Sequence, residues 1–244
     1  MILEFRAARE FPNADTRQKS LPRMADTATL KSRVIEGRRP GPHMLITGGV
    51  HGDEFEPMAA IRRLMHRIDP AGLQGRVTLV PVVNEAAYLR GHRTADDGLD
   101  LARVCPGCAD GSITEQAASA LSALIQTADY YIDLHTGGTT LAVYPLAGYT
   151  LHRDGRVLDA QRRMARSFNL PVVWGTPYLP GRSLSVAHDA GIPAIYAEYA
   201  GGGRCDPEGV DAYVDGCLNV LSELGLIERQ RPDDAVRHVV EDDT

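Results

Sequence analysis

Short apolar runs that alternate with segments of helical period constrain this chain more than any other feature. From residue 43 onward, these runs carry apolar residues almost without interruption, as buried central strands do. Between them, apolar residues recur at helical spacing. The alternation is typical of strands joined by crossover helices. It predicts an α/β domain with a mixed, mostly parallel central sheet and helices on both faces.

The pattern also divides the chain into segments. The predicted strands are residues 43–49, 76–83, 130–135, 140–146, 171–174 and 193–199, and the predicted helices are 58–68, 113–127, 155–169 and 210–224.

The remaining segments lack such a pattern. Residues 84–111 are polar and are predicted to form a long loop, and loops of that length inside compact domains are usually functional. Residues 1–23 show no period and are expected to be a loosely ordered extension before a catalytic domain at 24–230. Residues 231–244 form a charged tail, in which a new strand is predicted to begin at Val236.

Composition excludes several classes of partner. The net charge is -6 and no basic run is interleaved with aromatic residues, so nucleic acid is not expected as a partner. The apolar runs fall short of the roughly 20 residues that cross a bilayer, so no membrane partner is expected either. Charges interrupt the first twenty residues, which indicates a cytoplasmic protein. A homo-oligomer is left open.

Cysteines give little further information. The chain has four, too few for a disulfide scaffold at this length. Cys105 and Cys108 form a CxxC pair, but the second pair of a zinc ribbon is absent, as is the strand-to-helix turn of a thioredoxin-type site. We therefore expect neither a redox site nor a structural metal site at this pair.

The sharpest motif is GGVHGDE at residues 48–54, where a predicted strand gives way to a helix. His51 and Glu54 flank a tight turn at the carboxyl edge of the predicted sheet, where open α/β folds bind ligands. The motif YYIDLHTGG places His135 after another buried strand. His51, Glu54 and His135 together form a His2Glu set, which is typical of a catalytic zinc ion with one open position. Asp133 shares strand parity with His135, and we expect it to accept a hydrogen bond from an imidazole.

A hydrolytic zinc site also needs a general base, and Glu198 fits that role. It closes the apolar strand in AIYAEYAGGG, where burial is expected to raise the pKa of its carboxyl group. The alternative for Glu198 is a carboxylate that only caps or pairs near the loop.

Together these motifs resemble the succinylglutamate desuccinylase and aspartoacylase family, relatives of the zinc carboxypeptidases. The resemblance covers about residues 43–227 and depends on HGDE, DLHTGG, AEYAGGG and, in part, GLDLARVCPG. It implies a zinc carboxypeptidase-like fold, one Zn2+ per chain, and hydrolysis of the amide bond of a small N-acylated amino acid or amine. Family members also carry a smaller β-rich domain after the catalytic one, so residues 231–244 are expected to be its start or the end of a short form.

The resemblance further implies roles for residues of the long loop. Arg93 matches the family arginine that stabilises the oxyanion of the tetrahedral intermediate. The family motif Asp-Leu-Asn-Arg, whose Asn and Arg hold the substrate carboxylate, reads Asp-Leu-Ala-Arg here, with Ala102 in place of Asn. Arg103 is retained and is expected to bind substrate. The loss of the amide favours a site that has drifted toward amines without that carboxylate.

Aromatic residues provide two further candidates. The family lines its acyl pocket with the region that contains Trp174, Tyr178 and Arg182, and we take Tyr178 and Tyr144 as substrate-binding candidates, with simple packing as the alternative. Two other functions stay open for the whole chain: a zinc carboxypeptidase or peptidoglycan-type amidase acting on a peptide, and a metal-binding domain without turnover.

Overall fold

A mostly parallel sheet forms the centre of the computed structural model, which describes residues 30–230 and 232–242. The extension predicted over residues 1–23 lies outside the described residues. The strand order is β1-β3-β2-β4-β7-β5-β6-β8, and only the pairs β1–β3 and β5–β7 are antiparallel. The strands are β1 Arg33–Glu36, β2 Arg39–Thr47, β3 Gln74–Val80, β4 Tyr130–His135, β5 Ala142–Thr150, β6 Val172–Thr176, β7 Ala194–Gly201 and β8 His238–Glu241. The predicted sheet is confirmed.

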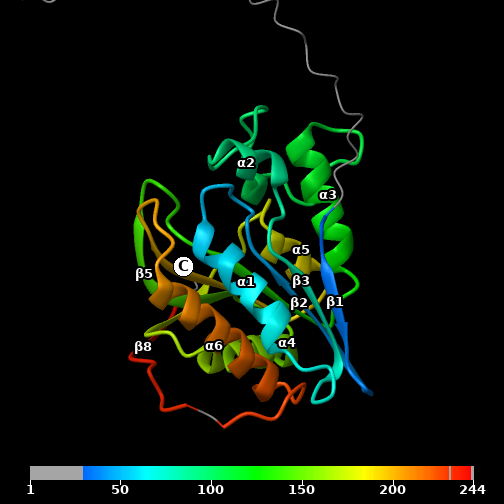
Figure 1. The fold of residues 1–244 in the computed structure, drawn as a ribbon, viewed down its shortest axis with the longest axis vertical. Coiled ribbons are helices and arrows are strands. Elements are labelled where there is room, and N and C mark those ends of the chain that lie inside the picture. Colours follow the sequence, from blue (N-terminus) through cyan, green and yellow to red (C-terminus); the bar gives the residue numbers. More distant parts are fainter. Residues whose placement is uncertain (1–29, 231, 243–244) are drawn as a thin grey trace, which may run out of the picture.

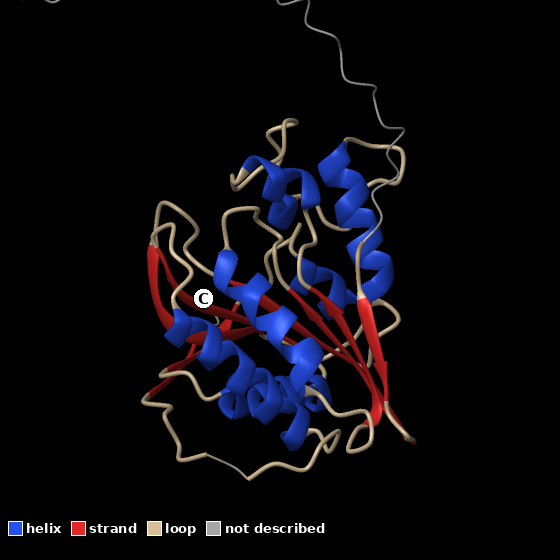
Figure 2. Ribbon diagram, in the orientation of Figure 1, coloured by secondary structure: helices blue, strands red, loops and turns tan. Residues whose placement is uncertain are grey.

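Helices cover both faces of this sheet, as predicted (Figures 1 and 2). One face packs against α1 (Phe55–Arg67), α4 (Gly155–Phe168) and α6 (Pro207–Glu223). The other packs against α3 (Ile113–Ile125) and α5 (Ser183–Asp189). Each helix turns its apolar stripe toward the strands, so two hydrophobic cores enclose the sheet.

Local capping explains where several helices begin and end. Ser112 and Glu115 form a capping box at the start of α3, and Asp154 caps the first turn of α4. Asn169 ends α4 in the left-handed conformation, with φ of 68°. The helix starts therefore follow signals that are already present in the sequence.

The prediction of a long loop over residues 84–111 is wrong in part. This stretch contains two helical segments, α2 (Glu85–Arg90) and the 3-10 helix η1 (Leu101–Arg103). The side chain of Asn84 accepts a hydrogen bond from the backbone N–H of Ala87, and Gly91 ends α2 with a positive φ. Asp100 caps η1 in the same way, through the backbone N–H of Ala102. Such short helices bury too few apolar residues to give a visible period.

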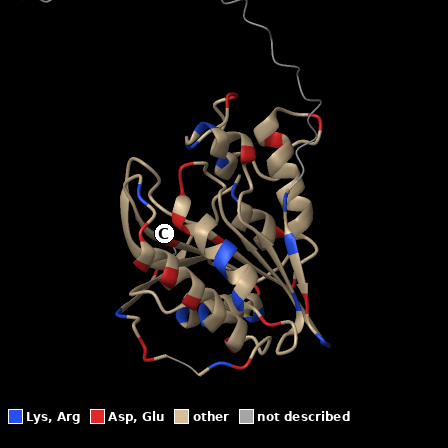
Figure 3. Cartoon of the chain, in the orientation of Figure 1, with Lys and Arg blue, Asp and Glu red and all other residues tan. Residues whose placement is uncertain are grey.

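Strand boundaries also differ from the predictions. β5 begins later and runs longer than the predicted 140–146, and β1 was not predicted. The strand predicted to begin at Val236 is β8, which begins at His238 and pairs with β6. Acidic and basic residues are interspersed over the fold (Figure 3). Among the described residues, no helix combines the length and the apolar character that a bilayer crossing requires.

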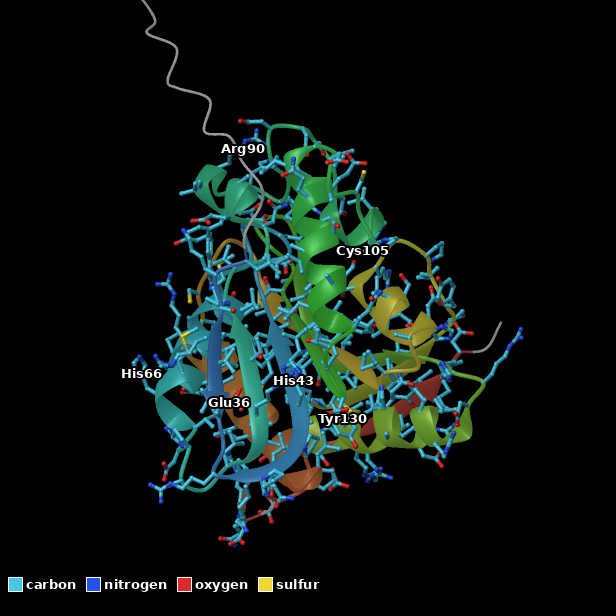
Figure 4. All side chains as sticks on the ribbon, turned by 90° about the vertical axis from the view of Figure 1, so that its right-hand side faces the viewer. Glu36, His43, His66, Arg90, Cys105 and Tyr130 are labelled. Carbon is cyan, nitrogen blue, oxygen red and sulfur yellow. The ribbon has the colours of Figure 1, made fainter. Side chains whose placement is uncertain are left out.

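The CxxC pair is divided between core and surface. Cys105 is buried and lies against α3 (Figure 4). Cys108 is exposed. Both thiols are free. Burial raises the pKa of Cys105 to about 12, so this thiol stays protonated at neutral pH.

Candidate metal and catalytic site

Three neighbouring parallel strands bring their carboxyl ends to one edge of the sheet. β2 pairs with β4 so that Thr47 lies beside Asp133, and β4 pairs with β7 so that His135 lies beside Glu198. Residues 48–54 follow β2 at the same edge and lead into α1. Motifs that are far apart in the sequence therefore meet where open α/β sheets bind ligands.

The turn after β2 requires glycine. A Cβ on Gly52 would lie 2.1 Å from the backbone carbonyl carbon of Ala87, so this turn packs directly against α2. Gly49 has a φ of 65°, a backbone conformation that residues other than glycine rarely adopt. The tight turn holds His51 and Glu54 on the same side of the chain, and both are buried.

The structure brings together the three predicted metal ligands. One ligand atom from each of His51, Glu54 and His135 lies within 4.8 Å of the others. Glu54 sits between the two imidazoles: its Oε1 is 2.6 Å from Nδ1 of His51, and its Oε2 is 3.1 Å from Nδ1 of His135. Both histidines thus present the same ring nitrogen to a shared point.

The other ring nitrogen of each histidine contacts a second carboxylate. Nε2 of His135 lies 3.1 Å from Asp133 Oδ2, as the strand parity predicted. Nε2 of His51 lies 3.0 Å from Asp100 Oδ1, a contact that was not predicted. Such carboxylates fix the tautomer of a metal-binding imidazole and make it a better ligand.

Asp133 is itself held in place. It is fully buried and accepts a hydrogen bond of 2.8 Å from the hydroxyl of Thr47 and another from the hydroxyl of Ser183. Tyr213 donates to the backbone carbonyl of His135. The ring of His135 is therefore fixed through both its backbone and its side chain.

Electrostatics agree with a cation site. Burial opposes ionisation of Glu54, but His135 and His51 outweigh it and lower the pKa of Glu54 to about 2. Burial likewise lowers the pKa of His135, yet Asp133 and Glu54 raise it well above its usual value. In the absence of metal, positive charge is thus stabilised where these groups meet. Two imidazole nitrogens and one carboxylate with supporting carboxylates fit a divalent transition metal.

Glu198 faces the same site from β7. It lines a cavity of about 230 Å3 together with His51, Glu54 and His135. Its Oε2 is buried and has no hydrogen-bond partner among the described residues. Burial raises the pKa of Glu198 to about 7, although the charge of His135 opposes this. A carboxyl group with an unpaired oxygen and such a pKa can accept and return a proton near neutral pH.

Three arginines also line this cavity. Arg93 is held by Asp100, whose Oδ2 accepts a hydrogen bond of 2.9 Å from it, and lies 3.8 Å from Glu54. Arg103 donates to the backbone carbonyl of Ala102 at 2.7 Å. Arg182 is half-buried, and burial, with the nearby charge of Arg103, lowers the pKa of its guanidinium. The cavity thus offers guanidinium groups beside the metal-ligand cluster.

The two predicted tyrosines are not among the residues that line this cavity. Tyr144 is 61% exposed on β5, and Tyr178 donates to Asp189 on the outer side of α5. Tyr196 and Arg182 line the cavity instead. Arg182 directly precedes α5, so of the segment 174–182 only its last residue reaches the cavity.

Comparison with known proteins gives a consistent result. The model of the succinylglutamate desuccinylase/aspartoacylase catalytic domain matches residues 40–224. An N-alpha-acetyl-L-2,4-diaminobutyric acid deacetylase from Halomonas elongata is 35% identical over 201 residues, which cover 78% of this chain and 57% of that protein. The chain therefore spans little more than half the length of this curated relative.

Solved structures show the same similarity. A succinylglutamate desuccinylase/aspartoacylase from Rhodobacter sphaeroides superposes with a TM-score of 0.80 at 30% identity, covering 88% of this chain and 66% of that one. The product-bound ectoine utilization protein EutE (DoeB) from Ruegeria pomeroyi superposes with a TM-score of 0.79 at 28% identity, covering 87% and 66%. Both sequence and fold thus place the chain in the succinylglutamate desuccinylase/aspartoacylase family.

Proposed function

We propose that this chain is a zinc-dependent hydrolase that cleaves the amide bond of a small N-acylated amino acid, releasing a carboxylate and a free amine. One observation carries the proposal. Two imidazoles backed by carboxylates and Glu54 meet in a cavity that Glu198 also lines, and burial raises the pKa of Glu198 to about 7. This combination contains the ligands of a hydrolytic metal and a base for water.

The donor set indicates how one Zn2+ would be held. Nδ1 of His51, Nδ1 of His135 and the carboxylate of Glu54 would bind it, and the bonds to Asp100 and Asp133 keep both rings oriented. When bound, zinc supplies Lewis acidity that polarises a carbonyl group and lowers the pKa of water.

Glu198 carries the proton transfer in this proposal. Its carboxylate accepts a proton from the attacking water and then returns that proton to the leaving nitrogen. The raised pKa of Glu198 suits both steps, because a carboxyl group with a pKa near the working pH exchanges protons in either direction. Arg93 lines the same cavity, and its guanidinium would donate to the oxygen that gains charge as the carbonyl is attacked.

Two observations bear on the substrate in opposite directions. Ala102, in place of the family Asn, favours amines without a carboxylate. Arg103 and Arg182, however, both line the cavity, and because a guanidinium binds a carboxylate in bidentate fashion, they favour a substrate that has one. The relative from Halomonas elongata is an Nα-acetyl amino acid deacetylase. We therefore propose N-acetyl and N-succinyl amino acids as substrates. The cytoplasmic location stays a prediction.

The proposal is tested by release of primary amine from a substrate panel. Metal-free protein, reloaded with one equivalent of zinc, is given N-acetyl and N-succinyl amino acids, the matching N-acyl amines without a carboxylate, and short peptides. We expect zinc-dependent turnover that is highest for the N-acyl amino acids. Preferential cleavage of peptides would instead show a peptidase or amidase, and the absence of turnover with zinc bound would show a binding domain.

A further inference from the structure

The start of α5 contacts both the metal-ligand cluster and the arginine side of the cavity. Ser183 is the first residue of α5, is buried, and lines the cavity. Its hydroxyl donates to Oδ2 of Asp133, the same oxygen that lies 3.1 Å from Nε2 of His135. The residue directly before it is Arg182, which also lines the cavity. Two adjacent residues thus reach the two sides of the site.

The backbone of Arg182 is tied to the first turn of α5. Its N–H donates to the hydroxyl of Ser185 at 3.0 Å, and that hydroxyl donates to the backbone carbonyl of Arg182 at 2.6 Å. These two bonds close a capping box at the start of the helix. Any shift of the first turn of α5 therefore moves Arg182 with it.

The residue before Arg182 packs against the chain that carries Arg103. The backbone carbonyl of Gly181 accepts a hydrogen bond of 3.0 Å from the N–H of Cys105. Gly181 has a φ of 84°, and a Cβ there would lie 2.4 Å from the backbone oxygen of Arg103. This close approach sets where Arg182 stands relative to Arg103, so the start of α5 is held from the arginine side as well.

From these contacts we propose that Ser183 is a positioning residue that couples zinc binding to recognition of the substrate carboxylate. Through Asp133 it orients His135, and through the first turn of α5 it fixes the place of Arg182 in the cavity. The inference rests on the proposed function, in which His135 binds zinc and Arg182 binds the carboxylate. Removal of the Ser183 hydroxyl should therefore weaken both zinc binding and the preference for a carboxylate.

Thr47 provides a matched control in the same hydrogen-bond network. Its hydroxyl donates to the other oxygen of Asp133, Oδ1, at 2.8 Å. Thr47 is buried, as Ser183 is, but it lies on β2 and is not among the residues that line the cavity. Thr47→Val and Ser183→Ala each remove one hydrogen-bond donor from Asp133. Only Ser183→Ala also changes the residue next to Arg182.

The test measures zinc affinity and substrate preference in both variants. Zinc affinity is measured by competition with a chromogenic chelator. Substrate preference is the KM for an N-acetyl amine without a carboxylate divided by the KM for the matching N-acetyl amino acid, both at saturating zinc. We expect each variant to lose about tenfold in zinc affinity. Only Ser183→Ala should lose preference for the carboxylate, by roughly fivefold.

A double substitution tests the path through Arg182. In the Arg182→Met background, Ser183→Ala should still lower zinc affinity but should not change the substrate preference further. Ser183→Gly, which also lacks the hydroxyl, takes the place of Ser183→Ala if that variant does not fold. Unchanged zinc affinity or unchanged preference without the Ser183 hydroxyl would overturn the proposal. So would an equal loss of preference in Thr47→Val, or a further loss in the Arg182→Met background.

Failure of the proposed hydrolase activity gives a different result from failure of this coupling. If the zinc-loaded wild type does not turn over either compound, their dissociation constants, measured by calorimetry, replace the two KM values. The comparison of Ser183→Ala with Thr47→Val then proceeds in the same way. A protein without turnover can thus still confirm or overturn the coupling through Ser183.

Discussion

The candidate site comprises the cavity lined by His51, Glu54, His135 and Glu198 and the carboxylates behind its histidines, and it has two halves that differ in how they are held. The strand-borne half consists of Asp133, His135 and Glu198, which lie in register on adjacent buried strands. The loop-borne half consists of Arg93, Asp100 and Arg103 from the segment between β3 and α3. Sheet hydrogen bonds fix the first half, whereas in the second half the side chain of Asp100 contacts His51 and Arg93, and Arg103 donates to the backbone carbonyl of Ala102. In the proposed function, the strand-borne half holds metal and transfers protons, whereas the loop-borne half supports His51 through Asp100 and binds the substrate through its arginines.

Replacing Glu198 should produce the largest effect. Glu198→Gln keeps the shape of the side chain but removes the proton acceptor, so kcat should fall by about 100-fold or more while bound zinc is unchanged. Steady-state kinetics and metal analysis measure the two quantities. Glu228→Gln, an exposed residue far along the chain, is the matched control. Full turnover in folded Glu198→Gln would exclude this residue from the reaction.

The second-largest effect should be a loss of zinc affinity, and its size should differ between a substitution in the strand-borne half and one in the loop-borne half. Asp133→Asn and Asp100→Asn each remove one carboxylate behind a histidine, which typically costs about 10- to 100-fold in metal affinity. We expect Asp133→Asn to fall at the upper end, because Asp133 is fully buried with its hydroxyl donors, and Asp100→Asn at the lower end. Competition with a chromogenic chelator measures both. The reverse order would show that the loop, not the strand, governs the metal.

Arg103→Ala should change KM more than kcat. Its guanidinium lines the cavity without contacting the predicted ligands, so its loss should raise KM for an N-acyl amino acid roughly tenfold. The matching N-acyl amine without a carboxylate serves as the control substrate, and its kinetics should be unaffected. Equal losses for both substrates would mean that Arg103 does not bind the carboxylate.

The substitution Ala102→Asn decides between two interpretations of the same loop. If the cavity uses a carboxylate, as we propose, the added amide should raise kcat/KM for N-acyl amino acids by several-fold at most. If instead the site has drifted toward amines, the amide should crowd the substrate or remain unpaired. Paired measurements on substrates with and without the α-carboxylate distinguish the two. A selective gain for the amine would contradict the proposed substrate class.

The smallest expected effect is a difference in reactivity among the four thiols. This difference measures how firmly the segment between β3 and α3 is packed. Cys105, at the end of the loop-borne half, is buried with its pKa raised to about 12, and Cys217 is buried with its pKa also raised. Cys108 and Cys205 are exposed. Under native conditions a thiol reagent should therefore modify Cys108 and Cys205 promptly and the other two only on unfolding. Prompt labelling of Cys105, located by peptide mapping, would show that the loop opens readily.

The strand-borne half could be predicted from sequence because its geometry is periodic. Alternation places Asp133 and His135 on one face of a strand, and the apolar run before Glu198 identifies a buried strand end. Parallel pairing then brings these ends together without further information. The same periodicity predicted the sheet and the helices on both faces.

The loop-borne half could not be predicted in this way. The contact between Asp100 and His51 joins residues 49 positions apart, and it depends on how α2 and η1 fold within the loop. Arg182 lies outside the periodic patterns of apolar residues, so periodicity does not indicate that this residue lines the cavity. Tyr144 and Tyr178 do not line the cavity, and their role in substrate binding stays a prediction, because aromatic character alone does not indicate which way a side chain at a strand or loop points.

The edge strand β8 has a consequence for how the protein behaves in solution. All four of its residues are exposed, so little apolar burial holds it on β6. Besides backbone pairing, it is held by Glu241, which accepts hydrogen bonds from Arg162 and from the hydroxyl of Tyr149. Arg162 and Tyr149 lower the pKa of Glu241, so this attachment persists above the ordinary carboxyl range and is lost as pH falls through the lowered value.

Loss of this attachment would uncover the hydrogen-bonding edge of β6, where Trp174 is already 39% exposed. An uncovered strand edge with apolar side chains is a template for pairing between molecules. Salt also weakens exposed ion pairs, so acid and high ionic strength act in the same direction on this edge. Association of protein molecules at this edge is thus expected to depend in part on the carboxylate of Glu241, which lies outside the cavity of the candidate site.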